Sequence, residues 1–457
     1  MRVERDALGE VEVPDDAYYG AETARAVRNF HISRQRQHPL LIRAIAQIKL
    51  AAARANVAVG ALSDEIGEVI ERAAQEIVEG GFADQFVVDA YSAGAGTSIH
   101  MNVNEVIANR AGELLGEPKG TYERVHPNDH VNMGQSSNDV FPTAMRIAIL
   151  TNLRSGLLFQ LDNLVGALNM RAEEFQGIVK SGRTHLQDAV PITLGHEFAA
   201  YANMVIRAAD PLFAAEKRLH RIPLGGTAVG TGFGTAPGYR EEVVKQLRAI
   251  TELDLESAED LVEAVRNLGD FAEFAGALKT LSLALGQIAN DLRMLSMGPR
   301  AGLAEISLPA VQPGSSMMPG KINPSIAEVM NMVCMRVSGA EHTVALAAGA
   351  GQLDMNVMTP VIADELLKGL GMLHRAVEGF TELCVKGIEA DVERCREFAE
   401  ASLGIATALD PVIGYERAAE LVVEAFRTGR TLKEVVRESG LVGEEQIDEL
   451  LDPRRYV

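Results

Sequence analysis

Residues 271–295 read FAEFAGALKTLSLALGQIANDLRML, and this stretch decides the fold. Its large apolar residues recur at alternating steps of three and four, at Phe271, Phe274, Leu278, Leu281, Leu285, Ile288, Leu292 and Leu295. Such steps place all of these side chains on one face of an α-helix, as the seam of a helical bundle requires. At 1.5 Å per residue the helix would be about 40 Å long. The stretch therefore predicts a long helix that packs against others of similar length.

The neighbouring segments extend this pattern over most of the chain. Similar apolar spacing runs from Ile147 to Leu168, and the segment 329–348 is small and apolar on several faces. A helix that is apolar all round must be buried, and one chain offers few helices long enough to cover it. We therefore expect a multi-helix bundle that is shared between subunits. The prediction is an all-α, mostly helical subunit with three parts: an N-terminal helical domain (1–138), a central long-helix bundle (139–390) and a small C-terminal helical domain (391–457).

Composition narrows the class of protein. The chain has 457 residues, 47% of them hydrophobic, and a formal net charge of −20, which argues against a nucleic-acid partner because such a partner needs a basic face. Its three cysteines have no metal-ligand spacing and suggest reduced thiols. The N-terminus is too charged for a signal peptide, and no apolar run is long enough to span a bilayer. We predict a cytoplasmic protein without a membrane partner.

Four polar islands, at 94–98, 126–138, 182–188 and 314–323, interrupt the helical pattern, and we expect them to be loops that build a site. The last belongs to GSSMMPGKINP, residues 314–324, in which Asn323 suits a helix N-cap and Pro324 the first helical position. Lys321 would then lie where a loop meets the positive end of a helix, which suits a carboxylate. It is no Walker loop, because that needs glycine in place of Ser315 and a hydroxyl in place of Ile322.

Neither a cofactor nor a metal is indicated. His185 stands three residues before Asp188, but no second histidine or cysteine follows at ligand spacing, so a structural role or the orientation of a water or carboxylate is expected. The stretch 225–232 reads GGTAVGTG and lacks the G-x-G-x-x-G spacing of a nucleotide site. The islands instead offer hydroxyls, amides, imidazoles and one lysine. That set suits a small dicarboxylate and proton abstraction next to a carboxylate.

Several of these stretches resemble the aspartase/fumarase superfamily, namely GAGTSIHMNVNE (94–105), HVNMGQSSND (130–139), GRTHLQDAVP (182–191) and GSSMMPGKINP. The resemblance covers essentially the whole chain, from LGEVEVPDDAYYGAET (8–23) to GYERAAELV (414–422). It implies a mostly helical three-domain subunit and a homotetramer with a central bundle. It also implies active sites that are built from three subunits.

The resemblance also implies residue roles. Ser315 is similar to the catalytic base that removes a proton beside the β-carboxylate, and backbone N–H groups of its own loop would stabilise its anion. Lys321 and Asn323 would bind that carboxylate, and His185, with Glu328 as its partner, would lie near the reacting carbon. Gly314 and Gly320 would be the hinges of a lid on which Met317 and Met318 exclude water. The remaining carboxylate and the amine would contact Thr97, Ser136, Ser137, Asn138 and Thr184.

Within the superfamily most features resemble the ammonia-lyase branch. These are DAYYG (16–20), His130, DAVPI (188–192), GPRAGLAEISLPA (298–310) and AGQLDMNVMTPVI (350–362). We therefore expect a carbon–nitrogen lyase that converts L-aspartate to fumarate and ammonia. Ser136-Ser137-Asn138 instead reads as in fumarases, whereas aspartases usually carry threonine in place of Ser137. A class II fumarate hydratase and a non-catalytic helical scaffold on the same fold stay open as alternatives.

Overall fold

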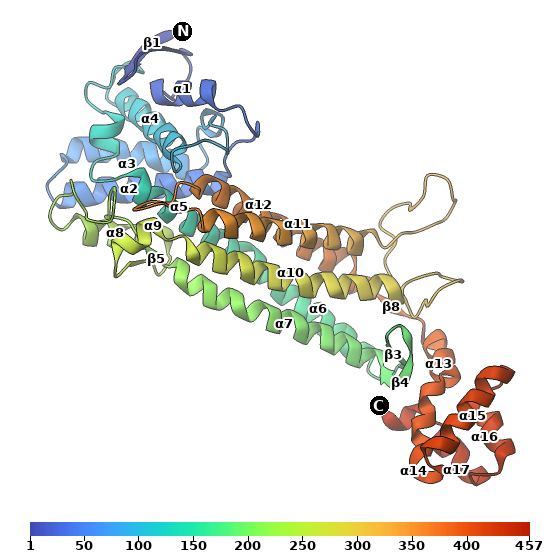
Figure 1. The fold of residues 1–457 in the computed structure, drawn as a ribbon. Helices are drawn as coiled ribbons and strands as arrows, with labels where there is room; N and C mark the ends of the chain where they lie inside the picture. Colours follow the sequence, from blue (N-terminus) through green and yellow to red (C-terminus); the bar gives the residue numbers. More distant parts are fainter. The chain divides into compact units, whose positions relative to one another are not determined.

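A computed structural model describes residues 1–457, and helices make up most of it (Figure 1). The few strands occur only in two-stranded pairs, β1–β2, β3–β4, β5–β6 and β7–β8. The prediction of an all-α fold is confirmed. None of the helices combines the length and the apolarity that crossing a lipid bilayer requires.

The chain forms two compact units, and each collects segments that are far apart in the sequence. The first unit comprises Met1–Phe159, Ala209–Leu283 and Val333–His374. The second comprises Gln160–Ala208, Ala284–Met332 and Arg375–Val457. The boundaries fall within long helices, namely α6 (Leu158–Glu174), α7 (Leu194–Leu219), α10 (Gly269–Leu295), α11 (Ser325–Ala348) and α12 (Thr359–Leu383). The division into three sequence domains stays a prediction.

In the first unit, helices follow an N-terminal hairpin. Its elements are β1 (Arg2–Asp6), β2 (Gly9–Val13), α1 (Ala21–Asn29), α2 (Pro39–Ala58), α3 (Asp64–Val78), η1 (Ala83–Gln85), α4 (Thr97–Leu114), η2 (Pro127–Val131), α5 (Ser137–Asn152), η3 (Leu153–Leu157), β5 (Arg221–Ile222), α8 (Tyr239–Thr251), β6 (Glu256–Ser257) and α9 (Leu261–Arg266). Local chemistry explains several helix starts. The Ser63 hydroxyl accepts the Ile66 N–H at α3, and Asp260 caps α9 in the same way. The short π-helical turn η3 joins α5 to α6, so the apolar pattern runs on without a break.

Residues 1–37 contain an antiparallel β-hairpin and α1, and the alternation in β2 buries only Val11 and Val13. One expectation for the first unit was wrong. The first polar island is only partly a loop. Gly96, with φ +85°, has a left-handed backbone and is the last residue before helix α4. The helix therefore begins at Thr97, and Thr97 and Ser98 belong to it.

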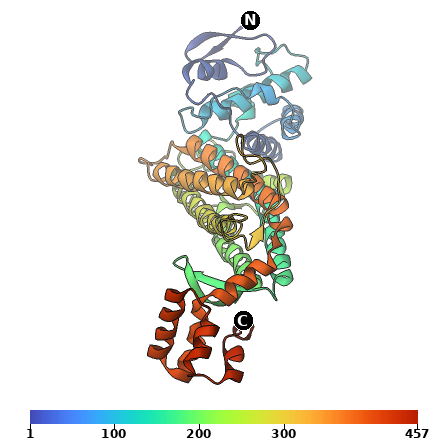
Figure 2. The ribbon, with the colours of Figure 1, turned by 90° about the vertical axis from the view of Figure 1, so that its right-hand side faces the viewer.

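The second unit contains a hairpin and a helical C-terminal segment. Its elements, besides parts of the long helices, are β3 (Val179–Thr184), β4 (Gln187–Thr193), β7 (Ile306–Ser307), η4 (Val385–Gly387), β8 (Glu389–Ala390), α13 (Val392–Ala401), η5 (Leu403–Leu409), α14 (Asp410–Ile413), α15 (Tyr415–Thr428), α16 (Leu432–Ser439), α17 (Glu444–Leu450) and η6 (Pro453–Tyr456). Helices α15 to α17 lie together in Figure 2 and share a small apolar core with Leu409, Leu421 and Val436.

The stretch that predicted the bundle forms α10 as expected. All of its seam residues, from Phe271 to Leu295, are at most 7% exposed. Helix α11 differs, because its outer face keeps large apolar side chains in the open: Val329, Met332, Met335 and Leu346 are 43%, 65%, 73% and 65% exposed. The single chain therefore buries one face of α11 and leaves a second apolar face uncovered.

Candidate active site

Ser315 sits in a turn that supplies hydrogen-bond donors to its hydroxyl oxygen. The backbone N–H groups of Met317 and Met318 donate to Ser315 Oγ at 3.2 and 2.8 Å. Two such donors favour a negative charge on that oxygen, because each bond is stronger to an anion than to a neutral hydroxyl. The side chains of Met317 and Met318 are 81% and 45% exposed. The loop thus presents a half-buried hydroxyl on a turn whose amides point at it.

The ends of this loop are tied together at its base. Gly314 N–H donates to the Lys321 carbonyl at 2.8 Å, and Asn323 Nδ2 donates to the Gly314 carbonyl at 2.7 Å. A Cβ on Gly314 would lie 2.6 Å from the Lys321 oxygen, so only glycine fits. The expected N-cap role of Asn323 was wrong, since α11 begins at Ser325 and the amide of Asn323 closes the loop instead.

Lys321 and Asn323 line an open cavity. This cavity has a volume of about 670 Å³, and its other walls come from residues 296–299, β7, β8 and the start of α13. Lys321 is exposed and makes no ion pair with any carboxylate of the chain. A second hollow of about 640 Å³, inside the loop, is lined by Ser315, Met318 and Lys321. An unpaired ammonium beside Ser315 and an amide is an arrangement that suits an anionic ligand.

The third polar island is a hairpin tip. Thr184 ends β3, Gln187 begins β4, and the two residues between them, His185 and Leu186, have φ values of +57° and +60°. This is the backbone of a two-residue hairpin turn with both central residues left-handed, which non-glycine residues seldom adopt. The expectation of a plain loop was wrong, and Thr184 and His185 are both exposed at the turn.

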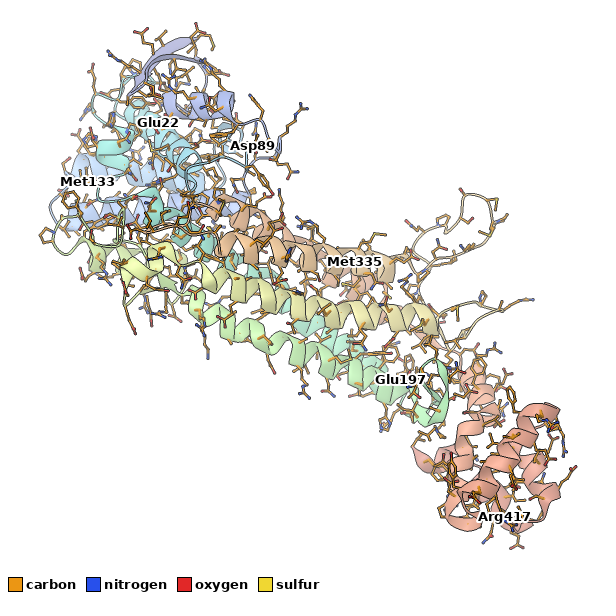
Figure 3. All side chains as sticks on the ribbon, in the orientation of Figure 1. Glu22, Asp89, Met133, Glu197, Met335 and Arg417 are labelled. Atoms are coloured by element: carbon orange, nitrogen blue, oxygen red, sulfur yellow. The ribbon has the colours of Figure 1, made fainter.

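A buried set of charges holds the base of this hairpin. Lys180 Nζ lies 2.8 Å from Glu197 and 3.0 Å from Glu305, and Arg183 Nη1 lies 2.9 Å from Glu305. Figure 3 marks Glu197 on α7 beside the hairpin. Burial raises the pKa of Glu197, while Lys180 opposes that rise. The two positive charges and the two negative charges of this group cancel. The ion pairs therefore hold the hairpin in place without leaving a net charge buried. The sequence pattern gave no signal for Glu305.

Glu328 and His185 are not brought together. Glu328 lies half-buried in the first turn of α11, and no hydrogen bond or ion pair joins it to His185. The imidazole of His185 has no hydrogen-bond partner within the chain. The structure therefore contains both groups on the second unit but no pair, and a pairing between them needs another copy of the chain or a rearrangement.

In the first unit the predicted hydroxyls lie at two helix starts. Thr97 is the first residue of α4, and Ser136 caps α5, its Oγ accepting the Asn138 N–H at 3.2 Å. The two starts are joined, because His100 Nδ1 contacts Ser137 Oγ at 2.8 Å. A Cβ on Gly96 would overlap the ring of Phe141, so glycine allows this close approach. The helix that follows the first polar island thus contacts the second island within one chain.

The buried carboxylate of Asp139 fixes the backbone of the second polar island. Its carboxylate accepts the backbone N–H groups of Ser136, Gly225 and Thr227 at 2.9, 3.0 and 2.9 Å, and Asn138 Nδ2 donates to the Ala228 carbonyl at 2.8 Å. Burial raises the pKa of Asp139 to about 6, against these stabilising bonds. The glycine-rich stretch 225–232 therefore packs on the start of α5.

No group of three or more His, Cys, Asp or Glu side chains is arranged to hold an ion. The three cysteines are buried and unpaired, and burial raises the pKa of each thiol to about 12. What the geometry offers is hydroxyls, amides and one lysine around open space.

Comparison with known proteins gives the family. A family profile described as Lyase matches residues 9–339, and one described as Fumarase C C-terminus matches residues 405–456. An aspartate ammonia-lyase of Bacillus sp is 48% identical over 99% of this chain and 97% of its own length. A class II fumarate hydratase of Thermus thermophilus is 45% identical over 100% and 98%. The solved structure of a fumarate lyase:delta crystallin from Brucella melitensis, bound to cobalt, matches with a TM-score of 0.96 at 46% identity over 100% and 99% of the two chains. The chain is thus a lyase that belongs to the aspartase/fumarase superfamily.

Proposed function

We propose that the protein is an aspartate ammonia-lyase, a carbon–nitrogen lyase that converts L-aspartate to fumarate and ammonia. The observation that carries the proposal is the turn at Ser315, where two backbone N–H groups donate to the hydroxyl oxygen while Lys321 stands unpaired nearby. The relatives named aspartate ammonia-lyase, at 44–48% identity over 99–100% of this chain, support the choice of substrate.

The reaction begins with removal of a proton from the β-carbon. The Ser315 alkoxide takes this proton, and the electron pair of the broken C–H bond moves into the neighbouring carboxylate, which becomes an aci-carboxylate. The Lys321 ammonium and the Asn323 amide stabilise the second negative charge that develops there. A serine hydroxyl is a weak base, so the two amides that hold its oxygen are what make the step possible.

Loss of ammonia completes the reaction. The electron pair returns from the aci-carboxylate to form the C=C bond of fumarate, and the C–N bond breaks with its electrons going to nitrogen. The substrate ammonium leaves as ammonia, and Ser315 then gives its proton to solvent. Thr97, Ser136, Ser137, Asn138, Thr184 and His185 bind the other carboxylate and the amine in this scheme.

The complete enzyme is proposed to be a homotetramer with sites shared between subunits. The support is the uncovered face of α11, on which Met332, Met335 and Leu346 are exposed; Met335 follows Met332 after three residues, and Leu346 lies eleven residues, about three turns, further along the same face. Such an apolar face is the seam of a helix bundle, and a second copy of the chain offers the matching surface. Figure 3 marks Met335 on this helix.

A class II fumarate hydratase is the second candidate. Ser137 in place of threonine and the 45% identical hydratase from Thermus thermophilus favour it. The two candidates share the base and the carbanion and differ in the group that leaves. A non-catalytic scaffold on this fold is less well supported, because Ser315, Lys321, Asn323 and His185 are all present.

The test is the ultraviolet absorbance of fumarate, followed with L-aspartate and then with malate. The proposal expects absorbance to rise with aspartate and to change little with malate. Release from malate alone would replace the ammonia-lyase by the hydratase. Absence of release from either, by protein that is a folded tetramer, would favour the scaffold or a different amino-acid substrate.

A further inference from the structure

A buried chain of polar groups runs from the interior of the first unit to Ser137. Lys49 on α2 and His100 on α4 are both 0% exposed. Lys49 Nζ contacts His100 Nε2 at 2.5 Å, and His100 Nδ1 contacts Ser137 Oγ at 2.8 Å. The imidazole is therefore the only link between a buried amine and a half-buried hydroxyl, and each contact uses one ring nitrogen.

The other two partners of Lys49 have fixed directions. Lys49 Nζ donates to Asn132 Oδ1 at 2.9 Å and to Gln135 Oε1 at 2.8 Å. The NH₂ groups of these amides donate to backbone carbonyls: Asn132 Nδ2 to that of Gln135, and Gln135 Nε2 to those of Val131 and Met133. Carbonyls only accept, so both amide oxygens must face Lys49. The amine therefore uses two N–H bonds here, whatever its charge.

The remaining contact of the Lys49 amine, with His100, sets the direction of the hydrogen bonds from Lys49 through His100 to Ser137. A charged amine has a third N–H, which would donate to Nε2. The neutral imidazole would then keep its hydrogen on Nδ1 and donate to Ser137, whose hydroxyl would keep one lone pair and a free O–H that can donate to a ligand. A neutral amine has a lone pair there and accepts the Nε2 hydrogen. Nδ1 then accepts the Ser137 hydrogen, and the hydroxyl offers only lone pairs to a ligand.

The surroundings favour the neutral amine. Burial lowers the pKa of Lys49 well below its ordinary value, and burial together with Lys49 lowers the pKa of His100. The charge of the Asp139 carboxylate on α5 acts to raise the pKa of Lys49, against the effect of burial. The oxygens of Asp139, however, already accept hydrogen bonds from three backbone N–H groups. Burial raises the pKa of Tyr239 on α8, so that side chain stays neutral. No anion touches the amine, and an uncompensated buried ammonium is costly.

We propose that Lys49 and His100 are positioning residues that hold the Ser137 hydroxyl as a hydrogen-bond acceptor, matched to the ammonium group of an amino-acid substrate. This rests on the proposed function, in which Ser137 contacts that amine. An ammonium group can only donate, so an acceptor binds it and a donor would repel it. The hydroxyl of malate both donates and accepts hydrogen bonds, so its binding depends much less on the direction of the Ser137 hydrogen bond.

The direct test is nitrogen NMR on the full chain labelled at histidine, with the His100 signal identified by its loss in His100→Asn. We expect the neutral ring to carry its hydrogen on Nε2. A neutral ring with the hydrogen on Nδ1, or a charged ring with both, would overturn the proposal. This readout needs no substrate, so it decides the direction of the chain even if the protein turns over no aspartate.

Kinetics test the link to substrate. His100→Asn should raise KM for aspartate about 10-fold, the loss expected for one hydrogen bond to a charged group, with a smaller change in kcat. In a Ser137→Ala background the same change should have no further effect, because both act through one hydroxyl. His220→Asn, which removes another buried histidine, one that contacts Arg154 beyond the far end of α5, should leave KM unchanged.

Additive effects of His100→Asn and Ser137→Ala would overturn the positioning role, as would an equal rise in the inhibition constant of malate against aspartate turnover. Lys49→Met should reproduce the His100→Asn result, and His100→Asn alone carries the test if Lys49→Met does not fold. Absence of aspartate turnover by the unmodified protein would instead overturn the proposed function, and with it the match to an ammonium group.

Discussion

Residues 136–139 and residues 314–323 carry two parts of the proposed site, and the protein holds them in different ways. The first lies at the capped start of α5, on top of Asp139 and the buried Lys49–His100 pair. The second is an exposed loop whose hydrogen bonds lie at its base and in its own turn. Burial makes the first part costly to deform, whereas the loop can move at little cost. The first is suited to recognising substrate and the second to closing on it.

Among the changes that leave Ser315 in place, removing the charge of the loop should have the largest effect. Lys321→Met should lower kcat/KM for aspartate by about 100- to 1,000-fold, because the aci-carboxylate loses its cationic partner. The melting temperature should stay the same, since Lys321 is exposed and makes no ion pair. Lys386→Met, which removes an exposed lysine paired with Glu382, is the control and should change neither quantity. A large loss of stability in Lys321→Met would show that this residue serves the fold.

At residues 136–139, removing a charged side chain should mainly lower the stability of the fold. Asp139→Ala leaves three buried backbone N–H groups without an acceptor and should lower the free energy of unfolding by about 4 kcal/mol. Thr431→Ala removes an exposed capping box at α16 and should cost only about 1 kcal/mol. Denaturant titration of both variants checks the difference, and equal losses would remove the distinction between buried and exposed parts.

The buried side should also respond to pH. Burial raises the pKa of Glu105, which accepts the N–H groups of Gly20, Glu22 and Thr23, from 4.5 to about 7. A raised carboxyl pKa contributes stability that is complete below the unfolded value and is lost as pH rises through the folded value. The difference corresponds to about 3 kcal/mol. The stability of the unmodified protein relative to Glu105→Gln should therefore fall by about this amount between pH 4.5 and pH 8. A difference independent of pH would contradict the assignment.

The smallest effect expected concerns the loop backbone. Gly320 has φ +77° with open space around it, and Gly440 has φ +62° with open space as well. Alanine at either position should cost about 1 kcal/mol of stability, because L side chains disfavour this conformation. Only Gly320→Ala should also lower kcat, by about 10-fold, if the loop closes during turnover. Equal activity of the two variants would argue against a hinge at Gly320.

Local rules were sufficient where the signal lies in neighbouring residues. The seam from Phe271 to Leu295 was read correctly, because the helical period depends on spacings of three and four. The helix start at Thr97 was missed, since a left-handed glycine before it, Gly96, reads as a break in the sequence. The hairpin turn at His185 and Leu186 was missed because both residues take a left-handed backbone conformation, which histidine and leucine seldom adopt.

Contacts between distant residues left no local trace. Lys49 and His100 are 51 positions apart, and Arg183 and Glu305 are 122 positions apart. Nothing in the spacing of either pair indicates that they meet, because their partners are fixed by packing of whole helices. The sequence therefore pointed, through resemblance to a family, to the residues that are proposed to face a ligand, and not to the buried residues that contact them.

The removal of the β-proton by Ser315 is the central step, and one measurement tests it directly. L-aspartate carrying deuterium at the β-position that is deprotonated is incubated with the unmodified protein and with Ser315→Ala, and release of deuterium to solvent is followed. The account predicts release by the unmodified protein and a rate at least about 1,000-fold lower for the variant, with fumarate bound equally well by both. Release by Ser315→Ala at a rate near that of the unmodified protein would contradict it.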